Sequence, residues 1–195
     1  LTLDGTYAVS AHSYQVADFG IPQFRDRVFI IGAKNGVVVP PMTPTHGATV
    51  GKKYRTVKEA LRGLPRAGDT SSIPNHIGRT HSQQIITRYE NLEFGERDPK
   101  TRINKLNPKR PSFTIIVGSD KGGGKGHVHP TIPREVTPRE SARMQTFPDW
   151  WEFSGTGRHV IRQVGNAVPP LFAALVAEHV RAHVFGEKTK RTYED

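Results

Sequence analysis

Residues 19–33, FGIPQFRDRVFIIGA, decide the fold. From Arg27 to Ala33 this stretch is a run of β-branched and aromatic residues that closes with a glycine, Gly32, and the pattern predicts a buried strand. Because polar residues do not alternate with the apolar ones, we expect the strand to be buried on both faces, as in a parallel sheet.

Three polar side chains, Gln23, Arg25 and Arg27, occupy alternate positions where this strand begins. Alternate residues of an extended chain share one face, so we expect these three opposite Phe24 and Asp26. Two guanidinium groups on one face repel each other unless an anion or a carbonyl oxygen lies between them. They are either surface arginines bridged by Asp26, or a site for a phosphate or for a carbonyl oxygen that gains negative charge.

Composition limits what the rest of the chain can do. Its 195 residues fit one large domain or two small ones. It contains no cysteine, which excludes disulfide scaffolds, cysteine-based zinc sites and a cysteine nucleophile from these residues. A net charge of +10 favours a polyanionic partner such as nucleic acid. No membrane partner is expected, because the longest largely apolar stretch, Ala167 to Ala177, is short and contains two prolines.

Positive charge is concentrated between Lys100 and Lys125, where seven cations accompany a single anion. Within this segment Phe113–Gly118 predicts a strand, and the run Lys121-Gly122-Gly123-Gly124-Lys125 predicts a flexible loop. The segment is either a solvated basic loop or a DNA-contacting loop, in which glycines allow close approach of the backbone and lysines neutralise phosphates.

Two capping boxes predict where helices begin, at Thr56–Glu59 and at Thr137–Glu140. The second of these helices must end before Pro148. A further helix is expected after Pro170, with Gly186 as its end.

Residues 163–170, QVGNAVPP, predict a tight turn that opens this last helix. Gly165 and Asn166 can adopt backbone conformations that other residues avoid. Either Asn166 caps the helix, or the free N–H groups of the first turn bind an anion.

Two further side-chain patterns are expected to have a structural role or no role in binding a metal. Glu140 and Arg143 lie three residues apart and can pair across one helical turn, which is typical of a structural ion pair. The histidine pairs 127/129 and 179/183 have the spacing of metal ligands, but neither is accompanied by a suitable third ligand, so we expect no metal.

Taken together, three blocks of sequence resemble the last three conserved blocks of the cytosine-5 DNA methyltransferases. They are FGIPQFRDRVFIIGA (19–33), TPRESARMQTFPD (137–149) and QVGNAVPP (163–170), in this order. About 100 residues of different character separate the first block from the second, and this stretch is similar to the family's target recognition domain. The resemblance covers essentially the whole chain.

The resemblance implies a chemistry and a set of roles. In that family a cysteine thiolate attacks C6 of a cytosine flipped out of duplex DNA, and C5 takes the methyl group of S-adenosylmethionine. It implies that Arg27 contacts O2 of the flipped base, and that Arg25, with Gln23, braces the pocket or a nearby phosphate. Residues of the last block would form part of the cofactor pocket: Gly165, Asn166, Ala167 and Val168.

The same resemblance assigns two further groups of residues. A structural group, Arg139, Glu140 and Arg143, would anchor the recognition domain to the catalytic one. A DNA-binding group would comprise Lys109, Arg110, Thr114, Lys121, Gly122, Gly123, Gly124 and Lys125.

Several blocks of the family have no counterpart in these 195 residues: the FxGxG loop for the cofactor, the Pro-Cys pair of the nucleophile and the Glu-Asn-Val block. The chain also begins with Leu1 rather than Met. We therefore expect the carboxy-terminal half of a methyltransferase, either as a fragment or as one chain of a split enzyme. An amino-terminal half or separate catalytic chain would supply the nucleophile and most of the S-adenosylmethionine site.

The expected fold is α/β. Residues 1–38 and 155–195 would form the distal part of a doubly wound methyltransferase sheet, and residues 39–154 a small mixed target recognition domain. The sheet part would expose an edge and an apolar surface suited to the other half. The expected setting is the cytoplasm of a bacterium, near the nucleoid.

Two other functions stay open at this level. A DNA-binding module without a methyltransferase role would need neither the QxRxR strand nor the GNAVPP turn. An RNA cytosine-5 methyltransferase would carry similar blocks, although a recognition region with a basic loop suits duplex DNA. The target sequence, the oligomeric state and the presence of a partner restriction enzyme cannot be read from these residues.

Overall fold

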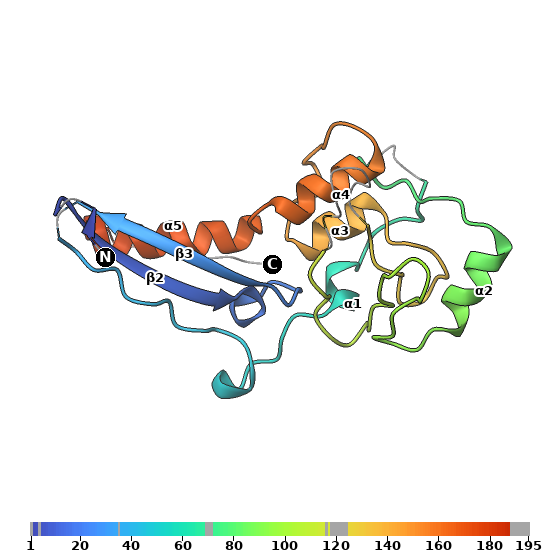
Figure 1. The fold of residues 1–195 in the computed structure, drawn as a ribbon, viewed down its shortest axis with the longest axis horizontal. Coiled ribbons are helices and arrows are strands. Elements are labelled where there is room, and N and C mark those ends of the chain that lie inside the picture. The colour runs from blue at the N-terminus through green and yellow to red at the C-terminus, as the bar shows by residue number, and fades with distance from the viewer. Residues whose placement is uncertain are drawn as a thin grey trace.

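The computed structural model describes residues 2–3, 5–34, 36–68, 72–115, 117 and 125–187. The molecule is elongated, with the strands and α5 at one end and α1 to α4 at the other (Figure 1). We call the first part the hairpin layer and the second, with its connecting loops, the loop-rich lobe. The elements are β1 (Thr2–Leu3), β2 (Tyr7–Gln15), a 3-10 helix (Val16–Phe19), β3 (Asp26–Ala33), a second 3-10 helix (Ala48–Val50), α1 (Val57–Ala60), α2 (Gln83–Asn91), α3 (Pro138–Met144), α4 (Gly157–Asn166) and α5 (Pro170–Phe185).

The predicted strand exists as β3, but its environment differs from the expectation. The sheet has the order β1-β2-β3 and both pairings are antiparallel, with His12 opposite Phe29. Exposure alternates along β3, so that Val28 is 66% and Ile30 71% exposed while Phe29 packs inward. The expectation of parallel pairing with burial on both faces was therefore wrong for the described strands, because a short connection returns the chain beside β2.

An aromatic cluster joins this sheet to α5. Phe172 is fully buried, and its ring meets those of Tyr14, Phe19 and Phe29 edge-on at centroid distances of 5.7, 5.3 and 5.4 Å. Such edge-to-face packing adds to the free energy gained by burying the rings. The helix ends as predicted at Gly186, which adopts a left-handed φ of 67°.

The loop-rich lobe is built around α3, which lies between α1 and α4. Both predicted capping boxes are present, at Thr56 and at Thr137. Helix α4 packs on α3 through a cluster that also contains Ile115, and α1 packs on α3 through a second cluster. The first of these clusters crosses the domain boundary expected at residue 155, although that division itself stays a prediction.

The longer elements without a counterpart among the predictions are β2, α2 and α4, and the short strand β1 and both 3-10 helices were not predicted either. The predicted strand Phe113–Gly118 is not a strand in its described residues, 113–115 and 117. Ser112, just before this segment, forms an isolated bridge with Gln23, just before β3: the amide of Phe24 donates to the Ser112 carbonyl and the amide of Ser112 donates to the Pro22 carbonyl, each at 2.9 Å. One bridge of this kind fixes the position of the chain without forming a ladder.

The segment Gly157–Phe185 is long and apolar enough, by length and composition, to cross a membrane. Its helix is interrupted between α4 and α5 by residues 167–169. Val160 and Val164 of α4 and Phe172 of α5 are buried in the clusters described above. The segment therefore serves as two core-facing helices in this fold.

Candidate catalytic face and nucleic-acid interface

Arg25 joins the first and last conserved blocks of the chain. Its guanidinium Nη2 donates hydrogen bonds to the carbonyl oxygens of Gly165, at 2.7 Å, and Ala167, at 3.2 Å. Only 2% of the residue is exposed, so the interpretation of a surface arginine was wrong. The carbonyls at the end of α4 are thus satisfied by a buried cation 140 residues earlier in the chain.

Polar atoms beside this contact have no partner among the described residues. They include both amide atoms of Gln23, which is fully buried, and the Nε and Nη1 atoms of Arg25. A buried amide or guanidinium without hydrogen bonds is costly, by about 1–3 kcal/mol for a neutral group. The start of β3 therefore offers donors and an acceptor to a further polar group.

Arg27 lies on the same side of the strand as Arg25. Its Nη1 donates to the carbonyl of Asp26 at 2.6 Å, and its side chain is partly exposed. Burial, and second the positive charge of Arg27, lower the pKa of Arg25 to about 10. The predicted shared face is confirmed, with Gln23 and Arg25 buried and Arg27 at the edge.

The block QVGNAVPP differs from the predicted tight turn. Gly165 and Asn166 are the last residues of α4, and neither adopts a positive φ. Gly165 is required for another reason, because a Cβ there would lie 2.9 Å from Cγ2 of Val117. The turn begins only at Ala167, and the amide of Leu171 in the first turn of α5 is capped by the Oγ1 of Thr146 at 3.1 Å.

Asn166 and Val168 are exposed beside Arg25's hydrogen-bond partners, whereas Gly165 is buried. Asn166, Ala167 and Val168 can therefore line the wall of a neighbouring cofactor site. Gly165 supports that wall from behind, through its packing on Ile115 and Val117.

Arg139 is a structural hub of the lobe. It is fully buried and donates to the carbonyls of Pro74 (2.9 Å), Pro148 (2.8 Å) and Trp151. Burial lowers the pKa of its guanidinium, with Asp149 opposing the shift. These contacts fasten α3 to the loops on both sides of it.

Glu140 and Arg143 do not pair with each other, and that prediction was wrong. Glu140 closes the capping box and accepts two hydrogen bonds from Arg134, at 2.7 and 2.8 Å. Arg143 instead pairs with Asp149 and donates to the carbonyl of Arg62 at 2.5 Å. The capping box turns the carboxylate toward the start of the helix, away from Arg143.

Two of the residues predicted to contact DNA already donate from their side chains to backbone carbonyls. Thr114 is exposed, but its hydroxyl donates to the Phe24 carbonyl at 2.8 Å, and Lys125 donates to the Thr101 carbonyl at 3.2 Å. Residues Lys121, Gly122, Gly123 and Gly124 lie outside the described residues. Lys105, from the same basic segment, caps α2 by donating to the carbonyls of Tyr89, Glu90 and Leu92.

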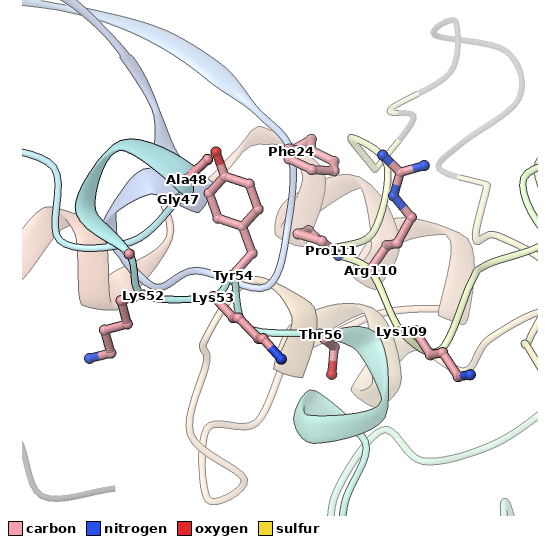
Figure 2. A pocket seen from close by; sticks show the side chains of 11 residues that line it. Phe24, Gly47, Ala48, Lys52, Lys53, Tyr54, Thr56, Lys109, Arg110 and Pro111 are labelled. Carbon is pink, nitrogen blue, oxygen red and sulfur yellow. The ribbon is translucent and has the colours of Figure 1, made fainter.

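Lys109 and Arg110 are exposed and line a groove of about 480 Å³ (Figure 2). The other wall of the groove contributes two cations that the sequence analysis missed, Lys52 and Lys53. They lie more than 50 residues earlier, outside the basic segment 100–125, in a second short basic run, Lys52-Lys53-Tyr54-Arg55. The groove is lined by Phe24, Gly47, Ala48, Gly51, Lys52, Lys53, Tyr54, Thr56, Lys109, Arg110 and Pro111.

Among the described residues no group of three histidine or acidic side chains is placed to hold a metal ion. His127 is buried and its Nε2 lies 3.2 Å from the carbonyl oxygen of Phe113, while the rings of His179 and His183 stack at 4.1 Å.

The sequence profile of the C-5 cytosine-specific DNA methylases matches residues 2–182. Type II methyltransferase M.BbvI of Brevibacillus brevis is 34% identical over 89% of this chain and 49% of its own length. Type II methyltransferase M.NgoFVII of Neisseria gonorrhoeae is also 34% identical, over 84% of this chain and 47% of its own length. The chain therefore spans about half the length of these curated relatives.

Solved structures share the fold. A protein described as a DNA modification methyltransferase encoded within a prophage, from E. coli, superposes with a TM-score of 0.74 at 27% identity, covering 95% of this chain and 63% of its own. The Dnmt2 methyltransferase of S. pombe superposes with a TM-score of 0.55 at 15% identity, over 91% of this chain and 59% of its own, a likeness of fold alone. The neighbours have a mixed α/β fold, and with a profile match over almost its whole length this chain belongs to the family of C-5 cytosine-specific DNA methylases.

Proposed function

We propose that this chain is the carboxy-terminal part of a DNA (cytosine-5)-methyltransferase of a restriction–modification system. In this proposal it binds duplex DNA and helps hold the flipped cytosine while C5 is methylated. The observation that carries the proposal is the contact of Arg25 with Gly165 and Ala167, which joins the strand of Arg27 to the turn that would line the cofactor site.

Arg27 is the residue for which we propose direct contact with the base. Its guanidinium is partly exposed at the end of a buried polar row, next to the unpartnered atoms of Gln23 and Arg25. A guanidinium donor placed against O2 of cytosine stabilises the negative charge that builds up there when C6 is attacked. Arg25, held by two carbonyls, positions the strand.

S-adenosylmethionine, which the family uses, supplies the methyl group when bound. Asn166, Ala167 and Val168 fit one wall of its site, because they surround the turn that Arg25 holds in place. The FxGxG loop of the family has no counterpart in these 195 residues, so we assign most of the cofactor contacts to the part of the enzyme outside this chain.

An amino-terminal half, or a separate catalytic chain, is the partner that we propose. The chain contains no cysteine, and the family's nucleophile is a cysteine. Among the described strands β3 is an edge, paired only with β2, and its outer face presents Val28 and Ile30. An open edge with exposed apolar side chains favours docking of further strands or helices.

Within this proposal residues 1–38 and 155–195 belong to the catalytic domain and residues 39–154 to target recognition. The Glu140–Arg134 ion pair and the Arg139 hydrogen bonds hold α3 on its neighbouring loops within the recognition part, because all their partners lie between residues 39 and 154. Relatives with 34% identity are bacterial Type II methyltransferases, which favours duplex DNA over RNA as substrate and the bacterial cytoplasm as setting.

The test is methyl transfer by the protein at its full natural length, or by this chain co-expressed with the catalytic half. Labelled S-adenosylmethionine is supplied with duplex DNA or with RNA of the same sequence. We expect label at C5 of cytosine in the DNA only. Folded protein that transfers nothing to DNA, or that labels the RNA instead, contradicts the proposal.

A further inference from the structure

The groove in Figure 2 has features of an anion site that no conserved block of the family explains. Its lining contains four cations and no carboxylate. None of the four cations, Lys52, Lys53, Lys109 and Arg110, forms an ion pair with a carboxylate anywhere in the described part of the chain. Like charges gathered in this way repel one another until a polyanion binds.

The positive charges of the groove contribute to a pKa shift of the neighbouring His46. The pKa of His46 is lowered, by burial first and then by the charges of Lys52 and Arg55, while Glu59 opposes the shift. His46 directly precedes Gly47 of the groove, and its amide donates to the carbonyl of Asp18 in the first 3-10 helix at 2.9 Å.

The walls of the groove are joined to each other before any ligand binds. The amide of Val57 donates to the Arg110 carbonyl at 2.9 Å, and that of Lys58 to the Pro108 carbonyl at 3.0 Å. These two bonds tie the segment after Tyr54 to the turn of Lys109. Fixed walls reduce the conformational entropy lost on binding.

An aromatic pair forms the floor. The rings of Phe24 and Tyr54 meet edge-on at 5.6 Å, and the Tyr54 hydroxyl donates to a carboxylate oxygen of Asp18 at 2.9 Å. Gly47 permits this packing, because a Cβ on it would lie 3.0 Å from the Tyr54 hydroxyl. The result is an apolar surface with cations at its sides, as Figure 2 shows for Lys53 and Lys109.

The groove also lies directly behind the catalytic face. Phe24 stands between Gln23 and Arg25 in the extended start of β3, and its side chain turns to the opposite side of the chain. The side chains of Gln23 and Arg25 are buried, that of Arg25 against the end of α4, whereas Phe24 lines the groove. One short segment thus faces both sites.

We propose that this groove binds the sugar–phosphate backbone of duplex DNA, independently of sequence, and so anchors the duplex beside the strand that carries Arg27. Lysine ammonium groups neutralise phosphates as point charges, and the apolar floor of Phe24, Tyr54 and Pro111 accommodates the sugars. The inference rests on the proposed function for the identity of the polyanion.

The test is duplex binding by the protein at its full natural length, followed by fluorescence anisotropy at several salt concentrations. The variant is Lys52→Gln/Lys53→Gln, and the probes are two duplexes of equal length and unrelated sequence. We expect affinity for both duplexes to fall roughly tenfold, with the slope of log affinity against log salt smaller by about two. Unchanged affinity and slope, or a loss on one duplex only, would overturn the proposal.

A second variant on the other wall, Lys109→Gln/Arg110→Gln, should give the same pattern, so that misfolding of one variant does not decide the matter. The charge-matched control is Lys34→Gln/Arg66→Gln, which changes two exposed cations outside both the groove and the basic segment and should bind like the unaltered protein. A control that loses as much as the groove variants also overturns the proposal.

The two proposals can fail separately. If both groove variants lose duplex binding but the unaltered protein transfers no methyl group, the groove proposal stands and the proposed function is refuted. If the unaltered protein transfers the methyl group but both groove variants bind duplex normally, the proposed function stands and the groove proposal is refuted.

Discussion

Phe172 in the hairpin layer and Arg139 in the loop-rich lobe are both fully buried, yet their surroundings differ. Phe172 is surrounded by three other aromatic rings, two on the hydrogen-bonded strands β2 and β3 and one on the first 3-10 helix. Arg139 is surrounded by three carbonyl oxygens from two loops, one before α2 and one between α3 and α4. The hairpin layer is thus held by apolar packing and the loop-rich lobe largely by buried polar side chains that satisfy irregular backbone.

This difference suits the division of labour that we propose. A sheet with an aromatic core gives Arg25 and Arg27 a fixed position. Loops that are held by hydrogen bonds from a buried side chain such as Arg139 can change in sequence while that side chain is kept. The comparison can be tested by perturbing each kind of stabilisation separately.

The largest effect is expected from Arg139→Met, which keeps the volume but removes three hydrogen bonds to two loops. Losing these buried hydrogen bonds, and leaving the carbonyls of Pro74 and Trp151 without this donor, should lower the free energy of unfolding by about 3–5 kcal/mol. Urea denaturation measures it. Arg62→Met, at an exposed position, is the matched control and should stay within about 0.5 kcal/mol. An equally small loss for both variants would show that the lobe does not depend on Arg139.

A pH effect of intermediate size is expected from the lobe's buried histidines. Burial lowers the pKa of His127 and of His129 to about 4. Because these folded-state values lie below that of the unfolded chain, near 6.5, the unfolded state takes up protons first, and stability falls as the pH drops from about 6.5 toward 4. Between pH 7 and 5 each histidine should remove about 2 kcal/mol.

Urea titrations at the two pH values check this, with His127→Gln as the variant. The variant should show a smaller difference between pH 7 and 5 than the unaltered protein, because one titrating group is gone. Equal stability at both pH values in the unaltered protein would contradict the assignment.

The smallest effect is expected from Lys105→Met. Its ammonium group donates to three carbonyls at the end of α2, and its loss should cost about 1–2 kcal/mol, confined to that helix. Hydrogen exchange should show faster exchange in α2 and unchanged exchange in β2 and β3. Equal acceleration in the strands would mean that the two parts of the molecule unfold as one unit.

The two regions also differ in how far they could be predicted. β3, both capping boxes and the Gly186 helix end carry strong local signals, and all are present in the structure. The antiparallel pairing of β3 was not predicted. Its exposed face carries the apolar residues Val28 and Ile30, so the strand is apolar on both faces, and that pattern is typical of a strand buried on both faces. Helices α2 and α4 were missed, since the first is largely polar and the second was interpreted as a turn because of Gly165.

The candidate site was predicted in outline. Gln23, Arg25 and Arg27 share one face, as alternation required, but no local rule indicates that Arg25 contacts carbonyls 140 and 142 residues away. The partner of Glu140 was misjudged for a similar reason, since the capping box had already fixed the direction of its carboxylate. Lys52 and Lys53 could be recognised only once the fold had brought them opposite Lys109.

The most direct test of the central claim is Arg27→Ala, with methyl transfer and duplex binding measured on the same preparation of full natural length. If Arg27 stabilises charge on the flipped cytosine, transfer should fall by about 100-fold or more. Duplex affinity should meanwhile stay within about twofold, because the backbone contacts remain. Losses of equal size in transfer and in binding would show that Arg27 is a phosphate contact and would contradict its assignment to the catalytic face.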